Sequence, residues 1–339
     1  MPVPEKLGGF KVLKEVTRIL LVSPRESGVL PLRLFRALAD QKINLPYATC
    51  VSDDRAWGLT LVVDAVNAVG TSAALVTAFT ERPALQYGGA ILSIFPHRKN
   101  PEITRALFEA FRREGVAPDA LASSPSAISV VLDEQILNRA SSALFGPFTF
   151  SAYRTPADWK LAQKGKEQLC KEVVASYQEK RPKVYGLEVQ DEQALLKIKL
   201  DKGQIAALGP AFGRLARPGL SLTFLATSPC RESNQDQISF CLPLSEDDFC
   251  QQVLREAAPL LDLRNIAPAA VFSMNGPHFG DRYGIISELL TAFETCGVEL
   301  LGLSCTIASV TGVVPSAQLA AAVEAIRGRF DIPSIIHRT

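Results

Sequence analysis

The chain has 339 residues, of which 47% are hydrophobic and 21% are charged, a composition typical of globular proteins with ample core material. Lys plus Arg number 36 against 35 for Asp plus Glu, so the net charge of +1 gives no electrostatic basis for binding nucleic acid or an anionic membrane. The length predicts about two or three domains.

The apolar patterning indicates neither a leader peptide nor a membrane span. The amino-terminal stretch MPVPEKLGGFKVLKEV lacks a continuous apolar core, and no apolar run reaches the roughly 18 residues that cross a membrane. We therefore expect a cytoplasmic protein. The 7 cysteines contain no C-x-x-C pair and the chain has only 3 histidines, so we expect no disulfide framework, no metal and no cofactor.

The first half of the chain contains two segments with clear element signals. Residues 33–50 read as the end of a helix, a turn and a strand, and residues 102–148 read as a helix, a strand hairpin and a second helix. Between the halves, Thr155 to Asp158 forms a helix start with a capping hydroxyl, a proline and an acid in the first turn. We expect a helical connector over residues 151–182.

The second half repeats this organisation and gives the clearest single unit. An apolar strand at 269–274 precedes a helix whose apolar residues share one face, and Gly297 follows where a helix-ending glycine belongs. A strand hairpin and another helix come next, so the order is β-α-β-β-α. This order is typical of a ferredoxin-like α+β unit, with an antiparallel sheet and both helices on one face.

Internal repeats relate the two halves. Residues 102–148 align without a gap on residues 284–330, and residues 33–50 align more weakly on residues 211–228. Scattered identities held in register over this length indicate two halves, each containing two related units.

The four units resemble the ACT domain, and the tandem arrangement resembles the duplicated regulatory region of aspartokinases. The residues that carry the resemblance are the D-x-x-G loop before a helix, 121–144 with its serine-rich turn, Leu34–Ala39 followed by Ile43 and Asn44, and 184–200. The resemblance implies four ferredoxin-like βαββαβ ACT modules arranged as two interwoven pairs. It also implies that leading strands at Val184–Val189 and Phe10–Leu13 cross over to complete the second module of each pair.

The resulting boundaries follow from the repeat and the resemblance. The first pair spans 9–150 with modules at about 14–82 and 88–150, the connector spans 151–182, and the second pair spans 183–334 with modules at about 194–262 and 267–334.

The resemblance implies an amino acid as the ligand, and one loop fits it best. Asp281, Arg282, Gly284 and Ile285 form the strand-to-helix loop and helix start in which the glycine has the family's position. Asp281 would fix the amino group, and backbone N–H groups near Gly284 would approach the carboxylate. The alternative is a tight turn that uses Gly for backbone freedom and Asp for local hydrogen bonds.

Further candidates lie near that loop or in the first half. Glu299 would pair with the ligand's amino group, unless it is a solvated strand residue, and Ser304 would hydrogen-bond ligand or partner, unless it serves the hairpin turn. Ser27, Gly28 and Asn44 make the corresponding site in the first half. His97 and His278 are expected in exposed loops, where they could sense pH or cap a ligand but have no necessary role.

The sequence predicts a protein that is not an enzyme. Only about ten residues precede the first predicted strand, and no nucleophile–base pair, phosphate loop or metal-ligand spacing is found, so we expect the kinase domain to be absent. The leading hypothesis is a non-catalytic allosteric regulator or sensor that binds an amino acid and forms a homodimer through sheet edges or helices. The alternative is a protein-interaction scaffold or separate regulatory subunit of a biosynthetic enzyme, with ligand binding lost, and an enzyme on this fold is the third hypothesis.

Overall fold

A computed structural model of the chain describes residues 4–24, 31–53, 56–78, 82–163, 181–231, 234–257, 262–276, 279, 282–307 and 309–338. The strands are β1 (Glu5–Leu7), β2 (Gly9–Pro24), β3 (Tyr47–Ser52), β4 (Ala56–Asp64), β5 (Ala84–Phe95), β6 (Ala120–Ser123), β7 (Ile128–Asp133), β8 (Phe148–Phe150), β9 (Gly186–Asp201), β10 (Phe224–Pro229), β11 (Gln235–Pro243), β12 (Leu263–Asn275), β13 (Gly302–Thr306), β14 (Ser309–Pro315) and β15 (Ile335–Arg338). The α-helices are α1 (Leu32–Asp40), α2 (Ala68–Ala78), α3 (Pro101–Arg113), α4 (Leu137–Ala143), α5 (Pro156–Gln163), α7 (Gly209–Leu215), α8 (Asp247–Ala257), α9 (Ile285–Cys296) and α10 (Leu319–Arg329). Short 3₁₀ turns precede several of them, at Ala65–Asn67, Glu134–Ile136, Ile205–Leu208, Leu244–Glu246 and Ser316–Gln318.

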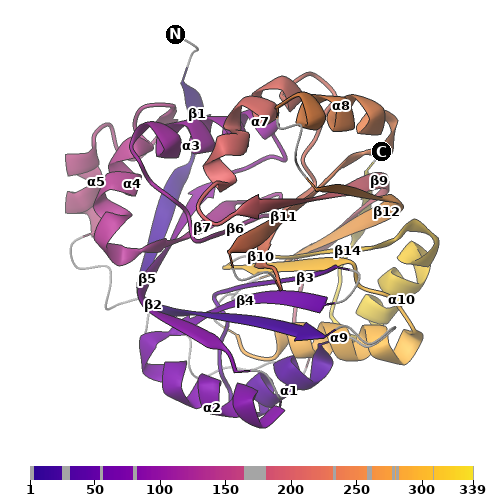
Figure 1. The fold of residues 1–339 in the computed structure, drawn as a ribbon. Coiled ribbons are helices and arrows are strands. Elements are labelled where there is room, and N and C mark those ends of the chain that lie inside the picture. The colour runs from indigo at the N-terminus through magenta and orange to yellow at the C-terminus, as the bar shows by residue number, and fades with distance from the viewer. Residues whose placement is uncertain are drawn as a thin grey trace.

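In the described part of the chain, 13 strands form one large, mostly antiparallel sheet that closes on itself, and β1 pairs with β8 in a separate two-stranded parallel sheet. Among the described residues the strand order is β11-β10-β6-β7-β5-β2-β4-β3-β13-β14-β12-β9-β15, and β11 also pairs with β9. We call the closed part of this sheet the strand ring. The predicted α+β class is confirmed, since helices cover the outside of a mostly antiparallel sheet whose neighbouring strands are often not consecutive in the chain (Figure 1).

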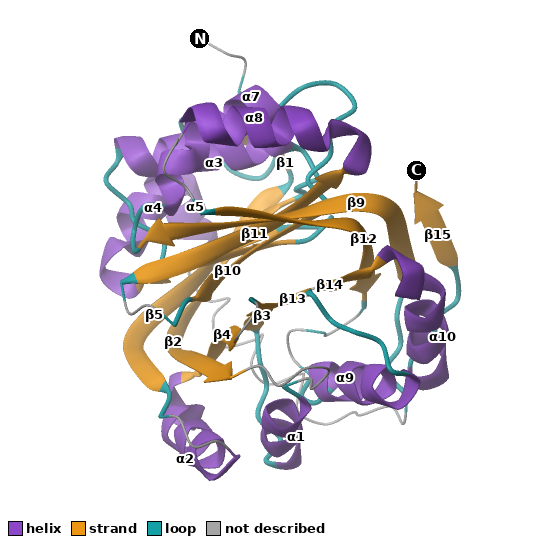
Figure 2. Ribbon diagram, turned by 45° about the vertical axis from the view of Figure 1, so that its right-hand side comes forward, coloured by secondary structure: helices purple, strands orange, loops and turns teal. Residues whose placement is uncertain are grey.

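Helices form two layers with the strands between them. Figure 2 shows α3, α7 and α8 on one side of the strands and α1, α2 and α9 on the other. Each layer packs on its own apolar core, one built around α1, α9 and α10 and the other around α3, α4, α7 and α8. Two smaller apolar clusters lie between strands, inside the ring.

The two halves of the chain join through strand pairs inside the ring. β3 of the first half pairs with β13 of the second, with Thr49 opposite Ser304, and β6 pairs with β10 in the same way. Buried hydrogen bonds cross the ring as well, such as Thr49 Oγ1 to the Thr227 carbonyl oxygen at 2.6 Å. The edges of β3, β13, β6 and β10 that face the other half are therefore paired within one chain.

The two longest strands, β2 and β9, each pair in two parts that are separated by a register shift. In β2, Phe10–Leu13 pairs with Ile91–Ile94, whereas Arg18–Leu20 pairs with the beginning of β5, and the register shifts between these parts. In β9, Leu187–Val189 pairs with Phe272–Met274, again with a register shift further along. A register shift of this kind bends a long strand, which lets one strand contribute to two packed regions.

The connector begins as its sequence predicts. Asp158 N donates to Thr155 Oγ1 at 3.2 Å and Thr155 N donates to Asp158 Oδ2 at 3.0 Å, a reciprocal cap at the start of α5. Trp159 is buried and its ring stacks on Phe10, with 4.7 Å between centroids. Residues 164–180, the remainder of the predicted connecting helix, lie outside the described residues.

Candidate functional site

The candidate site is a small pocket between α1 of the first half and α9 of the second, which we call the α1–α9 pocket. Three predicted site residues, Arg282, Gly284 and Ile285, line it together with residues that the sequence did not single out: Phe35, Leu38, Ala39, Ile43, Leu45, Phe279, Ile286, Ser287 and Cys305. The tertiary structure thus brings Arg282, Gly284 and the start of α9 in the second half onto α1 of the first half, and Figure 1 shows these two helices next to each other.

Gly284 shapes the entrance to this pocket. It precedes α9 with φ of 83°, a left-handed conformation that favours glycine, and its carbonyl oxygen accepts a hydrogen bond from Glu288 N at 2.9 Å. A Cβ at this position would lie 3.6 Å from the Ala39 Cβ. Glycine is therefore required by the turn, and its missing side chain also leaves space towards α1.

The pocket is nearly closed in this structure. Its volume is about 20 Å³, which is enough for about one water molecule. An amino acid would fit only if α1 and α9 moved apart or the side chains between them rearranged. A side-chain contact between the two helices, Arg36 Nη2 to Thr291 Oγ1 at 3.4 Å, lies on the exposed side.

The polar groups of the pocket are suited to binding and not to nucleophilic chemistry. Ser287 is buried, and its carbonyl oxygen accepts from Thr291 Oγ1 at 2.7 Å. Burial raises the pKa of the Cys305 thiol to about 12, so the thiol stays protonated at neutral pH and is a poor nucleophile.

Other predicted site residues lie outside the pocket or outside the described residues. Ser304 is buried on β13 and donates to the Ser123 carbonyl oxygen of β6 at 3.3 Å, so it joins the two halves. The Glu299 backbone N–H donates to Gln318 Oε1 at 2.7 Å, and Asn44 adjoins the lining residues Ile43 and Leu45. Asp281, Ser27 and Gly28 lie outside the described residues, as does His278.

The helices α3 and α7 of the other layer correspond by the repeat to α9 and α1, and the Arg105 side chain fills the space between them. The repeat aligns Ser287 with Arg105. The Arg105 side chain lies over Gly213 of α7, where a Cβ would come within 2.7 Å of its Cδ, and its Nε bonds both carboxylate oxygens of Glu102 at 2.9 and 2.8 Å. A large cation thus occupies the place that Ser287 leaves open beside α1.

His97 corrects a prediction, because it is fully buried and not in an exposed loop. Its Nδ1 lies 3.2 Å from the Ser124 carbonyl oxygen and its Nε2 lies 3.3 Å from Thr104 Oγ1. Burial lowers the pKa of His97 to about 4, so the ring is neutral near pH 7.

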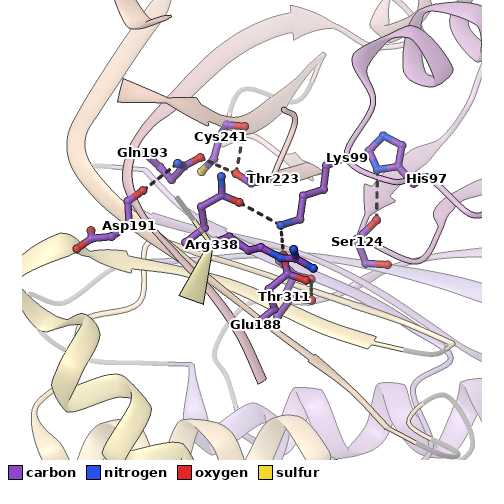
Figure 3. A network of polar contacts seen from close by, with 12 residues as sticks. His97, Lys99, Ser124, Glu188, Asp191, Gln193, Thr223, Cys241, Thr311 and Arg338 are labelled. Atoms are coloured by element: carbon purple, nitrogen blue, oxygen red, sulfur yellow. Dashed lines mark hydrogen bonds and ion pairs between the residues drawn. The ribbon is translucent and has the colours of Figure 1, made fainter. Parts of the chain in front are cut away.

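A polar network lies next to His97, and no sequence pattern predicted it. Figure 3 shows Lys99 reaching Glu188 of β9, and Arg338 of β15 lies near the same carboxylate, with Nε 3.5 Å from Glu188 Oε1. Lys99 also donates to Gln190 Oε1 at 3.0 Å. The partners are distant in the chain and follow no local spacing, so only an alignment of related chains could have signalled this pairing before the fold was known.

Neither a metal cluster nor a membrane-spanning helix is found among the described residues. No group of three or more His, Cys, Asp or Glu side chains in this part of the chain could hold a metal ion. Among the same residues, no helix combines the length and the apolar composition needed to cross a membrane.

Comparisons with known proteins match the fold and not the sequence. No protein-family model matches the chain, and no curated protein matches it. The solved structure of aspartate kinase from Synechocystis is similar over 97% of this chain and 57% of its own, with 17% identity and a TM-score of 0.77. The regulatory subunit of aspartate kinase from Thermus thermophilus matches 44% of this chain and 99% of its own, with 15% identity and a TM-score of 0.38.

The first match overturns several expectations. The structure that is similar to nearly the whole chain is that of a catalytic kinase. This finding contradicts the expectation of a non-catalytic regulator or scaffold and the expectation that the protein is not an enzyme. It also contradicts a resemblance restricted to the regulatory region without the kinase domain. This chain spans 57% of the length of the matched kinase. At 17% identity the likeness shows the fold alone.

Proposed function

We propose that this chain works as part of an aspartate kinase and that an amino acid bound in the α1–α9 pocket controls the enzyme. The observation that carries the proposal is the similarity of fold to an aspartate kinase over 97% of the chain. The pocket supports it, because the loop predicted to hold an amino acid lies against a helix from the other half.

The module organisation belongs to the same proposal. We infer four ferredoxin-like ACT modules in two interwoven pairs, at about 14–82, 88–150, 194–262 and 267–334, with a connector at 151–182. The pairing of Phe10–Leu13 with β5 and of Leu187–Val189 with β12 supports the interweaving, because each leading segment completes the sheet of the later module.

Ligand binding would act by separating α1 from α9. The closed pocket of about 20 Å³ admits no amino acid, so binding selects an arrangement in which the two helices are further apart. Because α1 belongs to the first half and α9 to the second, this change alters how the halves pack. A ligand with higher affinity for the open arrangement shifts the equilibrium by that difference in affinity.

The same similarity of fold supports proposals for the ligand contacts and for the oligomeric state. Arg282, Gly284 and Ile285 would contact the ligand, with Asp281 on its amino group and backbone N–H groups near Gly284 on its carboxylate. A cytoplasmic homodimer is also proposed. Its interface would use helix faces or the sheet edges that stay open, because β3, β13, β6 and β10 already pair within the chain.

Aspartate-dependent formation of ADP from ATP tests the proposal directly. The reaction is measured on the whole kinase that contains this chain, with each of the twenty amino acids as a possible effector, and we expect at least one to change the rate. Ala39→Leu places a larger side chain in the pocket from α1, so we expect it to remove the effector's influence while ADP formation without the effector persists.

Ala73→Leu on the exposed face of α2 is the matched control, and it should leave the effector response intact. Absence of aspartate-dependent ADP formation would contradict the assignment to an aspartate kinase. An effector response that survives Ala39→Leu would place the effector elsewhere and remove the pocket from the proposal.

A further inference from the structure

A second hollow lies at the end of the strand ring where β2, β4 and β10 meet, far larger than the α1–α9 pocket. We call it the cation cleft. Its volume is about 400 Å³, within the range of small-molecule sites. The lining residues are Leu20, Leu21, Val22, Pro24, Ala56, Arg82, Ala84, Lys202, Pro229, Cys230 and Arg231.

The floor of the cation cleft is apolar and partly open. Side chains alternate along a strand, so Leu20 and Val22 of β2 share the inward face of the ring with Arg18. Arg18 is buried deeper in, where Nη2 lies 3.0 Å from Asp119 Oδ1, whereas Leu20 and Val22 are only half-buried. Two aliphatic side chains therefore remain accessible at the mouth of the ring.

The walls of the cation cleft carry one sign of charge. Arg82, Lys202 and Arg231 are exposed cations, and no acidic side chain is among its lining residues in the described part of the chain. Two carboxylates adjoin the lining. Asp53 Oδ1 accepts a hydrogen bond from Ala56 N at 2.7 Å. Burial raises the pKa of Asp236, and the positive charges of Lys202 and Arg18 partly offset this rise.

Both halves of the chain build the cation cleft. β2, β4 and Arg82 come from the first half, whereas Lys202, Pro229 and Arg231 come from the second. Strands β4 and β10 approach so closely here that a Cβ on Gly58 would overlap the Pro229 carbonyl oxygen. The cleft is therefore fixed by rigid strand ends and not by loops alone.

We propose that the cation cleft is a second ligand site, which binds a small organic anion: a phosphate ester or a carboxylate with an apolar body. Two guanidinium groups supply paired donors for phosphate or carboxylate oxygens, and the lysine adds a point charge. The volume exceeds that of an inorganic ion, and Leu20 and Val22 offer apolar contact to the remainder of the ligand.

Phenyl phosphate, benzoate and inorganic phosphate are the probes, each titrated into the whole chain by calorimetry at low ionic strength. We expect saturable binding of phenyl phosphate or benzoate, and the tighter of the two assigns the anionic group. Inorganic phosphate should bind more weakly than phenyl phosphate, because it cannot use the apolar floor. The double variant Arg82→Gln/Arg231→Gln should weaken binding roughly tenfold or more.

Arg139→Gln, which removes an exposed arginine on α4, is the matched control and should change affinity less than twofold, roughly the scatter of such a titration. Ala39→Leu should also leave binding intact, which separates this site from the α1–α9 pocket. The proposal is overturned if neither organic anion binds saturably, if inorganic phosphate binds as tightly as phenyl phosphate, or if Arg139→Gln weakens binding as much as the double variant. Circular dichroism and urea unfolding of the double variant show whether it folds; if it does not, Lys202→Gln replaces it.

Discussion

Two glycines bracket α9 and use the same backbone conformation for different purposes. Gly284 has φ of 83° before the helix, and Gly297 has φ of 64° after it. At Gly297 the turn alone requires glycine, since a Cβ placed there would have nothing within 4 Å. At Gly284 the same requirement coincides with the α1–α9 pocket, so sequence alone could not separate the structural role from the binding role.

Gly284→Ala and Gly297→Ala distinguish these roles. Each substitution forces an L side chain into the left-handed region, so each should lower the free energy of unfolding by about 1 kcal/mol. Only Gly284→Ala adds a methyl group facing Ala39, so only this variant should weaken binding of the amino acid effector. Urea unfolding and calorimetry measure the two effects, and equal loss of affinity in both variants would contradict the assignment.

His97 makes stability depend on pH. Its pKa is lowered from 6.5 to about 4 in the folded state by burial, so below pH 6.5 the unfolded chain takes up a proton that the folded chain does not. The stability that the neutral ring contributes is present above pH 6.5 and is lost as the pH falls towards 4. Between about pH 7.5 and about pH 5.5 this group alone should remove about 1.4 kcal/mol of stability.

His97→Gln tests this dependence, because glutamine keeps hydrogen-bonding groups but does not titrate. Urea unfolding of both proteins at these two pH values gives the difference that belongs to His97. Burial raises the pKa of Asp119 and Asp236, but both carboxylates titrate in both proteins and cancel in the comparison. An unchanged pH dependence in the variant would show that His97 is not its source.

At the scale of elements, helices that are equivalent by the repeat differ in what they leave open. α1 and α9 meet through small or apolar side chains and enclose a pocket, whereas α3 and α7 meet through Arg105 lying over Gly213. One helix, α2, is unusual in its surface, because Val66, just before it, and Val69 and Val76 within it are all largely exposed. No charged residue occurs between positions 65 and 78.

Gly70 within α2 offers a stabilising substitution. A Cβ placed on it would have nothing within 4 Å, and its φ is not left-handed, so Gly70→Ala should raise the free energy of unfolding by about 0.5–1 kcal/mol. Gly115→Ala, after α3, should have the opposite sign, because Gly115 has φ of 61° with equally open surroundings. Urea midpoints of the two variants measure both changes, and a shift of the same sign in both would contradict this reasoning.

At the scale of the whole molecule, ring closure makes the two halves one structure. β3 pairs with β13 and β6 with β10 across the two halves, and the pairing of β11 with β9 within the second half closes the strand ring. The cation cleft and the α1–α9 pocket both lie where the halves meet.

Gly58→Ala probes this closure. The added methyl group would overlap the Pro229 carbonyl oxygen, which belongs to backbone, so β4 and β10 would have to separate. We expect a loss of about 2 kcal/mol in the free energy of unfolding. Gly186→Ala is the matched strand control, since a Cβ there would lie an ordinary 3.7 Å from Ser334 Oγ, and equal effects in the two variants would contradict a special role for the crossing.

Features that depend on residues close together in the chain could be predicted from the amino-acid sequence. The helix at 285–296, its end at Gly297 and the reciprocal cap at Thr155 were predictable, because periodicity, left-handed glycines and caps act over a few residues. The α+β class followed from the order of such elements. The position of Gly284 as a turn followed in the same way.

The contacts between segments that are distant in the chain could not be predicted and are seen only in the folded structure. The burial of His97, the pairing of Lys99 with Glu188 and the gathering of Arg82, Lys202 and Arg231 each join residues from separate parts of the chain. The closure of the strand ring and the packing of α1 on α9 belong to the same class. These features depend on burial and charge among residues that no local pattern relates, so they appear only when the strands have been placed side by side.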